Sequence, residues 1–508
     1  MTMTGSNTIE RIPTGISGFE HVTLGGLPAG RSTLVSGTTG SGKTLFAVEF
    51  LSRGIMRFNE SGVFVTFEET STDIRRNAAS LGFPVQLWED EGKWAFVEAS
   101  ASIGEDTPAV GAYDFGALVA RIEHAVRQTG ARRVALDSLN AIFTQFTDSG
   151  IVRHELFRIA SALNALGVTS VLTAERPEEY DGVTRYGVEP FVLDNVIILR
   201  NVLRQGRRTR TVEIVKFRGA QHRTGEWLFT IDPRDGIVVV PLAFLTPSDH
   251  ASLARVSSGI PELDEMCGGG FYRDAIVLIT GPTGAGKTMA SLRFAAAAVE
   301  AGERCLLCTF DGTPGQLFRS AASWGLDLKA MQAAGLLRVM CGYAEVMSPE
   351  DHFLQLRNAI EEFAPGRLVI DTLSALERVA APRTLLDFII ALTAVLRQRE
   401  ITTLLTGTPA GRFNSANAPL ITSDVAALAD VWIQLRYVTG PVEIQRAIAV
   451  LQARGSAHDH SIRQFRIDRT GMHIGEPLTS APHGFTEAIS PGGAWESPES
   501  EVTEGPSG

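Results

Sequence analysis

Short apolar, β-branched runs alternate along this chain with longer amphipathic segments. In the first half the runs stand at 32–37 (STLVSG), 62–67 (GVFVTF), 133–138 (RVALDS), 169–174 (TSVLTA) and 194–199 (DNVIIL). Runs without polar alternation are typical of parallel strands that are buried on both faces, and the segments between them are typical of helices that cover the sheet. The pattern predicts an α/β fold with a mostly parallel central sheet.

Three blocks of sequence recur in the same order. Residues 25–44 correspond to 269–288, 131–139 to 365–373, and 210–222 to 446–458. Such self-similarity indicates two copies of one domain. We expect a first domain at 1–247, a second at 248–475, and a disordered tail at 476–508, where Pro, Gly, Ser, Thr and Glu leave too few apolar side chains for a core.

Composition narrows the class of protein. The 508 residues include 46 Lys and Arg against 57 Asp and Glu, a net charge of −11. This balance argues against a protein that coats nucleic acid, because such binding depends on neutralising phosphates. No apolar run reaches the ~18 residues that span a bilayer, the first residues are polar, and four cysteines suggest no disulfide framework. We expect a cytoplasmic protein with no membrane or nucleic-acid partner.

Two glycine-rich loops match G-x-x-x-x-G-K-[ST], at 37–44 and 281–288, and each follows an apolar run and precedes a helical pattern. In such loops the backbone N–H groups cradle phosphates, and the helix amino terminus adds its positive end. Lys43 and Lys287 are predicted to contact the β- and γ-phosphates of ATP, and Thr44 and Thr288 to ligate Mg²⁺.

Two aspartates follow apolar runs in matching places, Asp137 after RVAL and Asp371 after RLVI. A carboxylate at the carboxyl end of a strand beside the P-loop is placed to hold Mg²⁺. The alternative is an ordinary helix N-cap role.

The two copies differ where the next strand ends. The first has Glu68-Glu69 and the second has Asp311-Gly312. Paired carboxylates beside a γ-phosphate can align the attacking water and hold it or the metal. We therefore expect the first copy to be the better hydrolase, with Asp311 a metal ligand in the second. The alternative is an exposed charge pair at the end of a strand.

The closing strands differ as well. Lys216 and Arg218 have period-two spacing and share one strand face, whereas the second copy has Gln452 and Arg454 in these places. Two cations on one face suggest charge stabilisation of phosphates, in this or a neighbouring subunit. A solvated basic face is the alternative.

Several longer motifs resemble the KaiC family of circadian-clock ATPases and autokinases. They are FEET at 67–70, RHELFR at 153–158, TRYGVE at 184–189, DNVIILRNVL at 194–203, DEMCGGG at 264–270 and SWGLD at 323–327. The resemblance covers almost all of residues 10–475. It implies two RecA-like domains per chain, a homohexameric double ring, and ATP at the subunit interfaces of each ring.

The resemblance also implies which residues bind the nucleotide. The first site would comprise Gly40, Ser41, Gly42, Lys43, Thr44 and Leu45, with Ser80 nearby and with Lys216, Phe217, Arg218, His222 and Asp232 from the adjacent subunit. The second would comprise Thr283, Gly284, Ala285, Gly286, Lys287 and Thr288, with Trp324 beside the base and with Arg446, Arg454, His458 and Asp459 from the neighbour.

The chain departs from the family in three places. The second glutamate pair is replaced by Asp311-Gly312. The Ser-Thr pair that the family phosphorylates is replaced by Ala426-Ala427 or, one residue on, Ala427-Leu428, so the nearest hydroxyls are those of Thr422 and Ser423. The segment that KaiA captures is not recognisable in the tail. We expect no KaiA-like partner, whereas a KaiB-like partner remains open through 111–117.

Four functions are compatible with these features. We favour a hexamer that hydrolyses ATP mainly in its first ring, binds ATP in its second ring for assembly, and acts as a clock or signalling switch. The others are a serine/threonine autokinase, a RecA-like DNA-dependent ATPase, and a non-catalytic scaffold that binds ATP. The net charge of −11 weighs against the DNA-dependent enzyme, and fold analogy alone does not support it.

Overall fold

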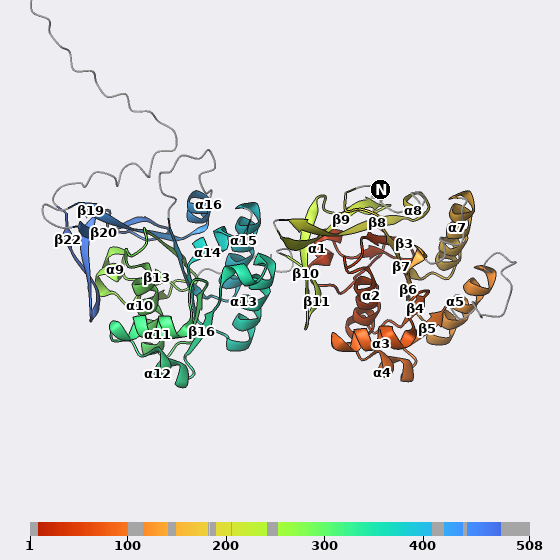
Figure 1. Ribbon diagram of the computed structural model, residues 1–508, viewed down its shortest axis with the longest axis horizontal. Coiled ribbons are helices and arrows are strands. Elements are labelled where there is room, and N and C mark those ends of the chain that lie inside the picture. Colours follow the sequence, from red (N-terminus) through yellow and green to blue (C-terminus); the bar gives the residue numbers. More distant parts are fainter. Residues whose placement is uncertain are drawn as a thin grey trace, which may run out of the picture. The chain divides into compact units, whose positions relative to one another are not determined.

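The computed structural model describes residues 9–99, 115–140, 149–180, 182, 189–204, 206–240, 252–380, 382–408, 421–439 and 444–478. These residues form two compact units, each built on one nine-stranded sheet (Figure 1). Most of the tail, residues 111–114 of the 111–117 region, and 184–188 of the TRYGVE motif lie outside the described residues. No described helix is long and apolar enough to cross a membrane.

The first sheet has the strand order β11-β10-β9-β8-β3-β7-β6-β4-β5. From β5 to β8 all neighbours are parallel, and β9 to β11 extend the sheet as antiparallel strands. The bounds are β3 (Ser32–Gly37), β4 (Gly62–Thr66), β5 (Trp94–Glu98), β6 (Arg133–Asp137), β7 (Thr169–Glu175), β8 (Asn195–Arg204), β9 (Arg207–Phe217), β10 (Glu226–Asp232) and β11 (Gly236–Val239). A short pair, β1 (Arg11–Ile12) and β2 (Leu27–Pro28), precedes it.

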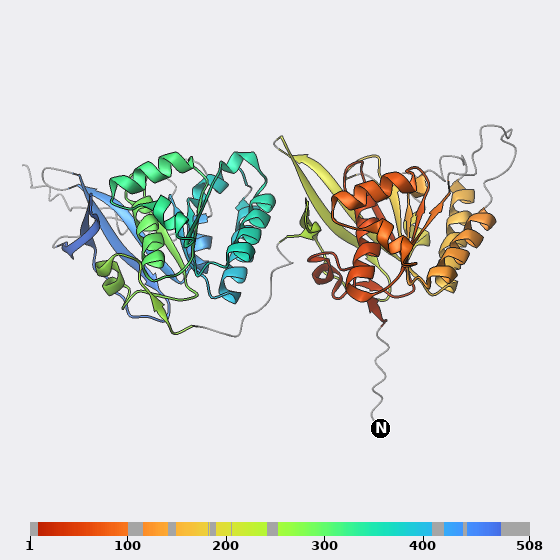
Figure 2. The same cartoon turned by 90° about the horizontal axis from the view of Figure 1, so that it is seen from below.

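Helices cover both faces of this sheet (Figure 2). One apolar cluster joins α2, α3 and α4 to alternate strand residues such as Val35 and Phe64. A second joins α5 and α7 to the intervening residues, among them Leu34 and Val65. This alternation is why the strand sequences show no polar face. The helices are α1 (Phe19–Thr23), α2 (Lys43–Phe58), α3 (Ser71–Ser80), α4 (Val85–Asp90), α5 (Phe115–Thr129), α7 (Ser149–Ala165) and α8 (Glu189–Val192).

The second sheet repeats the first, with the strand order β16-β15-β17-β18-β14-β19-β20-β21-β22. Its strands are β14 (Ile276–Thr280), β15 (Cys305–Thr309), β16 (Leu337–Cys341), β17 (Arg367–Asp371), β18 (Thr402–Gly407), β19 (Val431–Thr439), β20 (Ile444–Ala453), β21 (Arg463–Asp468) and β22 (Gly471–Pro477), preceded by the pair β12 (Arg255–Val256) and β13 (Phe271–Tyr272). The duplicated sequence therefore folds as a duplicated topology, and the predicted α/β class is confirmed.

The helices of the second copy also follow the first. Helix α10 packs almost entirely within the apolar cluster that α9, α11 and α12 complete. The bounds are α9 (Pro261–Met266), α10 (Lys287–Glu300), α11 (Pro314–Ser323), α12 (Leu328–Ala333), the 3₁₀ turn η3 (Ala344–Val346), α13 (Pro349–Phe363), α14 (Leu373–Glu377), α15 (Pro382–Gln398) and α16 (Ile421–Leu428). In both copies the P-loop strand lies inside the sheet, so the parallel strands beside it end next to the P-loop.

Candidate functional site

The first P-loop joins β3 to α2. Gly40 and Gly42 have φ of 75° and 99°, a region that other side chains rarely adopt, so the loop can curl its backbone around an anion. Lys43 Nζ donates to the carbonyl oxygen of Thr38 over 2.9 Å. The hydroxyl of Ser41 is buried and has no hydrogen-bond partner among the described residues. Leu45 packs against the apolar cluster below the loop.

The metal ligands predicted for the first copy are in direct contact. Thr44 Oγ1 donates to Asp137 Oδ2 over 2.8 Å. The other carboxylate oxygen of Asp137 accepts a hydrogen bond from Thr173, one strand along. The structure thus brings both predicted oxygen ligands together beside the P-loop. A helix N-cap role for Asp137 does not require this contact.

Four carboxylates lie close enough to Lys43 to act on the charge of its ammonium group. Burial lowers the pKa of its ammonium group, and Glu175, Asp137, Glu68 and Glu179 act in the opposite direction, in that order of strength. All four lie at the carboxyl-end edge of the first sheet. Asp137 and Glu68 were predicted from the sequence, whereas Glu175 and Glu179 were not, although ERPEE directly follows the apolar run at 169–174 and was the available signal.

The predicted glutamate pair consists of Glu68, one of these four carboxylates, and Glu69, which follows it. Glu68 Oε1 is 3.5 Å from Ser138 Oγ, next to Asp137, and Asn77 Nδ2 donates to Glu69 Oε2 over 3.5 Å. Desolvation raises the pKa of Glu69, and the negative charges of Asp137, Asp73 and Glu68 raise it further. A carboxyl group with a raised pKa is a better proton acceptor near neutral pH, as a residue that activates water requires.

The two unforeseen glutamates bond to the P-loop itself. Thr39 Oγ1 donates to Glu175 Oε1 over 2.7 Å, and Thr38 Oγ1 donates to Glu179 Oε1 over 2.5 Å. The second oxygen of Glu179 accepts the backbone N–H of Asn201 on β8 at 3.1 Å. Glu179 therefore links the P-loop to the neighbouring strand.

The second P-loop opens into a cavity of about 620 Å³. Its lining includes every predicted residue of the second P-loop apart from Ala285, together with Asp311, Trp324, Asp371 and Arg446. Lys287 Nζ donates to the carbonyl oxygens of Gly281 and Pro282 at 2.6 and 3.0 Å, and Thr406 Oγ1 donates to Asp371 Oδ1 at 2.5 Å. Ala285 is fully buried behind the loop.

The charge around Lys287 differs from that around Lys43. Burial lowers the pKa of Lys287, and among the described carboxylates Asp371 is the one that raises it. Asp311 lines the cavity but is the sole acidic side chain at the end of β15, because Gly312 and Thr313 follow. The second P-loop is thus less acidic than the first.

Arg446 was predicted to come from a neighbouring subunit, but it lines the cavity of its own chain. It pairs with Tyr437 across β19 and β20, and β19 adjoins the P-loop strand β14, so the hairpin carries Arg446 to the cavity. Its buried Nε has no partner among the described residues. Arg446 can therefore face a ligand without a second chain.

The remaining predicted cations lie near the amino ends of the parallel strands, away from the P-loops. Lys216 Nζ donates to the carbonyl oxygen of Leu193, and Arg218 lies near Asp194, just before β8 begins. Burial, and then the charge of Arg218, lower the pKa of Lys216. Because Asn195 aligns with Thr33 and Leu199 with Gly37, these cations are roughly 13 Å along the strands from the P-loop. They are too far to contact a phosphate held by Lys43 in the same chain.

The other predicted partner residues are placed as follows. Phe217 and His222 stack edge to face with ring centroids 5.6 Å apart, and Asp232 accepts the N–H groups of Arg234 and Asp235 in a turn. In the second copy Arg454 Nη2 donates to the carbonyl oxygen of Ala427, His458 lies against His460, and Asp459 pairs with Arg463. Ser80 ends α3 and donates to the carbonyl oxygen of Asn77.

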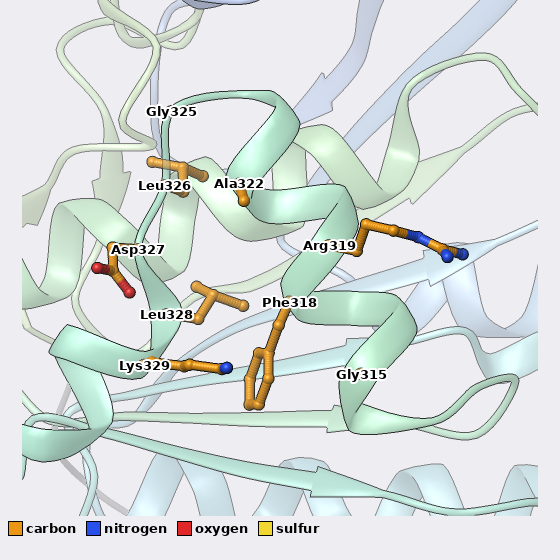
Figure 3. A pocket seen from close by; sticks show the side chains of 9 residues that line it. All are labelled: Gly315, Phe318, Arg319, Ala322, Gly325, Leu326, Asp327, Leu328 and Lys329. Atoms are coloured by element: carbon orange, nitrogen blue, oxygen red, sulfur yellow. The ribbon is translucent and has the colours of Figure 1, made fainter.

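A separate cavity of about 530 Å³ lies between α11 and α12 (Figure 3). Phe318, Leu328 and Lys329 border it. In the first copy Arg75 stands in place of Phe318 and joins Glu89 of α4 through two hydrogen bonds of 2.5 and 2.9 Å. The ion pair bridges α3 and α4, whereas the corresponding groove in the second copy has an apolar wall.

Both P-loops fit a nucleotide with Mg²⁺. The first offers a buried unpaired hydroxyl on Ser41, a lysine, and adjoining oxygens of Thr44 and Asp137. The second offers a cavity lined by Lys287 and Arg446 for phosphates and by Thr288, Asp311 and Asp371 as oxygen donors. Hard oxygen ligands next to substrate phosphates are what Mg²⁺ prefers.

Comparisons with known proteins agree with this geometry. The family model described as KaiC ATPase matches residues 12–243 and again 256–479. The circadian clock protein KaiC3 of Synechocystis sp. is 49% identical over 470 residues, which cover 92% of each chain. The circadian clock oscillator protein KaiC of Thermostichus vulcanus is 45% identical over 473 residues, 93% of this chain and 90% of that protein. The corresponding protein of Synechococcus elongatus is 45% identical over 466 residues, 92% of this chain and 89% of that protein. The family model matches nearly the whole chain, and each matched stretch contains one P-loop. This chain therefore belongs to the KaiC family of ATPases.

Proposed function

We propose that the chain hydrolyses ATP mainly in its first repeat, and that the second repeat mainly binds ATP to support assembly. One observation carries this proposal: in the first repeat Glu68 lies 3.5 Å from Ser138, next to the contact between Thr44 and Asp137, and has Glu69 beside it. In the second repeat the corresponding strand ends in one carboxylate, Asp311, followed by Gly312. Hydrolysis needs groups that hold the metal and orient water as well as groups that hold phosphate. The first repeat has a carboxylate pair that can orient water as well as groups that hold phosphate. The second repeat has phosphate-holding cations, Lys287 and Arg446, but no such pair.

Each side chain of the first repeat has a role in this mechanism. Lys43 and the P-loop N–H groups hold the triphosphate, and Thr44 and Asp137 would hold Mg²⁺. Bound Mg²⁺ neutralises charge that develops on the phosphate oxygens. Glu68 and Glu69 orient the attacking water and accept its proton, a role that the raised pKa of Glu69 favours. In the second repeat the side chain of Asp311 is one methylene shorter than that of Glu68, and its neighbour Gly312 carries no carboxylate.

We propose that the assembly is a homohexameric ring in each repeat. Lys216 and Arg218 cannot contact the P-loop of their own chain, and a neighbouring subunit is where such cations become useful. An arginine supplied in trans is worth ~10³–10⁵ in phosphoryl-transfer rate. Phe217, His222 and Asp232 accompany them in the first ring, and Arg454, His458 and Asp459 occupy the matching region of the second.

The biological role that follows is a clock or signalling switch read by protein partners. The relatives are named circadian clock proteins, and the family model of a KaiC ATPase matches this chain twice, which supports this role. We propose a KaiB-like partner at the first ring, no KaiA-like partner and no nucleic-acid partner. The domains run from 1 to 247 and from 248 to 475, followed by the tail at 476–508.

Autokinase activity is the second candidate function, because the family includes autokinases. Ala426 and Ala427 carry no hydroxyl, so the acceptor position of the family lacks a nucleophile. We therefore place kinase activity behind hydrolysis in this chain.

Steady-state ATPase measurements on Lys43→Ala and Lys287→Ala variants, each checked by light scattering, test the proposal. We expect the first to lose turnover and keep its assembly, and the second to lose chiefly subunit association. Equal loss of turnover in both variants with rings preserved contradicts the asymmetry. Turnover that survives Lys43→Ala unchanged would place hydrolysis outside the first repeat and contradict the proposal.

A further inference from the structure

Glu175 and Glu179 are the two carboxylates near Lys43 that are neither the predicted metal ligand Asp137 nor part of the predicted pair Glu68-Glu69. Glu175 ends β7, and Glu179 follows four residues later. Their side chains accept hydrogen bonds from the hydroxyls of Thr39 and Thr38, so both charges lie directly on the loop that cradles phosphate.

Each glutamate is held in place by more than its threonine. The backbone N–H of Glu175 donates to Asn140 Oδ1 at 2.9 Å, and Glu179 accepts the N–H of Asn201 at 3.1 Å. Arg200 Nε also donates to the carbonyl oxygen of Glu179 at 3.1 Å. These bonds hold the backbone of both residues, and the carboxylate of Glu179 itself, beside the P-loop.

The second repeat supplies an internal comparison. Ser36 pairs with Ala174 and Thr280 with Gly407, so Thr408 stands where the first repeat has Glu175. The backbone bond is kept, because the N–H of Thr408 donates to Ser374 Oγ at 2.8 Å as that of Glu175 does to Asn140. One of the two P-loop donors is also changed, since Pro282 replaces Thr38 and has no hydroxyl, whereas Thr283 keeps the hydroxyl of Thr39.

The electrostatic consequence is specific to the charge of the ligand. Metal-free ATP brings more negative charge to the loop than the Mg²⁺ complex, and the two partly buried carboxylates repel it more strongly than they repel the complex. We propose that Glu175 and Glu179 make the first repeat select the Mg²⁺ complex of the nucleotide over the metal-free nucleotide, whereas the second repeat accepts both. This selectivity rests on the proposed function only in placing nucleotide at Lys43.

Nucleotide stoichiometry tests the inference without measuring turnover. Full-length protein stripped of nucleotide is dialysed to equilibrium against a non-hydrolysable ATP analogue, in Mg²⁺ and in EDTA. We expect about two nucleotides per chain with Mg²⁺ and about one in EDTA. Lys43→Ala should bind about one in both conditions, which identifies the first repeat as the metal-dependent site.

The decisive variant is Glu175→Gln combined with Glu179→Gln, which keeps acceptor oxygens and removes both charges. Its first repeat should bind the analogue in EDTA about tenfold or more tightly than the unmodified repeat does, with a much smaller change in Mg²⁺. Glu178→Gln is the matched control, since Glu178 is exposed and is not among the carboxylates that act on Lys43. It should behave as the unmodified chain.

Thr38→Val combined with Thr39→Val separates charge from hydrogen bonding. It removes both hydroxyls and leaves both carboxylates, so discrimination against metal-free nucleotide should persist. Two nucleotides per unmodified chain in EDTA, or a double glutamine variant that still excludes metal-free nucleotide, overturns the inference. The proposed function fails on a different result, namely equal turnover by both repeats, so the two failures are distinguishable.

Discussion

Thr44 Oγ1 donates a hydrogen bond of 2.8 Å to Asp137 Oδ2, which ties the first turn of the P-loop helix to the end of a neighbouring strand. The two residues are 93 positions apart, and the parallel sheet brings them together because β3 and β6 end at the same edge. The pair presents two oxygen atoms that would hold Mg²⁺. Loss of either oxygen should therefore affect turnover more than folding.

Thr44→Val should lower ATP turnover by about ten- to a hundredfold, because a hydrogen bond to a charged group is worth ~1.5–3 kcal/mol and the metal ligand is lost as well. Thr44→Ser keeps the hydroxyl and should retain most of the activity. Initial rates across a Mg²⁺ titration measure the effect. A Thr44→Val variant that recovers full turnover at high Mg²⁺ would show that the hydroxyl contributes to metal affinity alone.

Glu68→Gln combined with Glu69→Gln should reduce total turnover by about a hundredfold or more, because a misplaced or absent water-orienting group costs ~10²-fold. Asp311→Asn, the matched change in the second repeat, should reduce total turnover by less than about twofold. Light scattering of both variants confirms that assembly is intact. The reverse ranking of the two variants would assign hydrolysis to the second repeat.

The sequence was sufficient for the fold because local pattern and motif agree in both copies. Apolar runs predicted the buried parallel strands, and the P-loop and aspartate motifs marked the strand ends that meet at one edge. Side chains whose role depends on tertiary contact were harder to assign. Glu175 and Glu179 were not predicted from the sequence, because their place in the site depends on β7 ending beside the P-loop strand.

Arg446 shows the same limit in the opposite direction. Arg446 and Arg454 lie in the same repeated block, 446–458, and the resemblance placed both in a neighbouring subunit. The register of β19 and β20 sets Arg446 opposite Tyr437, near the P-loop, and Arg454 beyond Val431, at the other edge. Arg446 and Arg454 are eight residues apart and lie toward opposite ends of β20, which the sequence spacing does not reveal on its own.

Glu49 predicts a pH dependence of stability. This fully buried residue of α2 accepts the N–H of Ile237 at 2.6 Å, and burial raises the pKa of its carboxyl from 4.5 to about 7. The folded state therefore holds the proton more firmly than the unfolded chain, so the free energy of unfolding falls as pH rises between these values. The total change is about 3 kcal/mol.

Glu49→Gln should abolish this contribution while keeping an acceptor for Ile237. Its thermal midpoint relative to the unmodified protein should rise as pH increases from 5 to 8, and then stay level. Glu123→Gln on α5, a change at a more exposed carboxylate, should show no such trend. A difference that is flat across the range would mean that Glu49 titrates as an ordinary glutamate.

The acceptor position of the second repeat predicts the absence of stoichiometric phosphorylation between residues 415 and 430. Ala426 and Ala427 offer methyl groups, and intact mass measured after incubation with ATP should show no added phosphate. Ala426→Ser with Ala427→Thr supplies hydroxyls but should gain little phosphate, because Asp311-Gly312 stays in place. Adding Asp311→Glu and Gly312→Glu should raise the phosphate content. Phosphate on Thr422 or Ser423 of the unmodified chain would contradict this prediction.

Mixed assemblies determine whether Lys216 and Arg218 act on a neighbour. Lys43→Ala removes the P-loop cation and keeps the strand-end cations, whereas Lys216→Ala combined with Arg218→Ala does the reverse. Each variant alone should be nearly inactive. In an equal mixture assembled before nucleotide is added, about a quarter of the interfaces of a head-to-tail ring would join an intact P-loop to intact cations. Turnover should rise to roughly that fraction of the unmodified rate.

Lys43→Ala mixed with Glu68→Gln/Glu69→Gln is the control, because both defects lie on the same side of the interface and no mixed interface is complete. If the first mixture is no more active than its parents, although light scattering shows rings of both chains, these cations do not act across the interface.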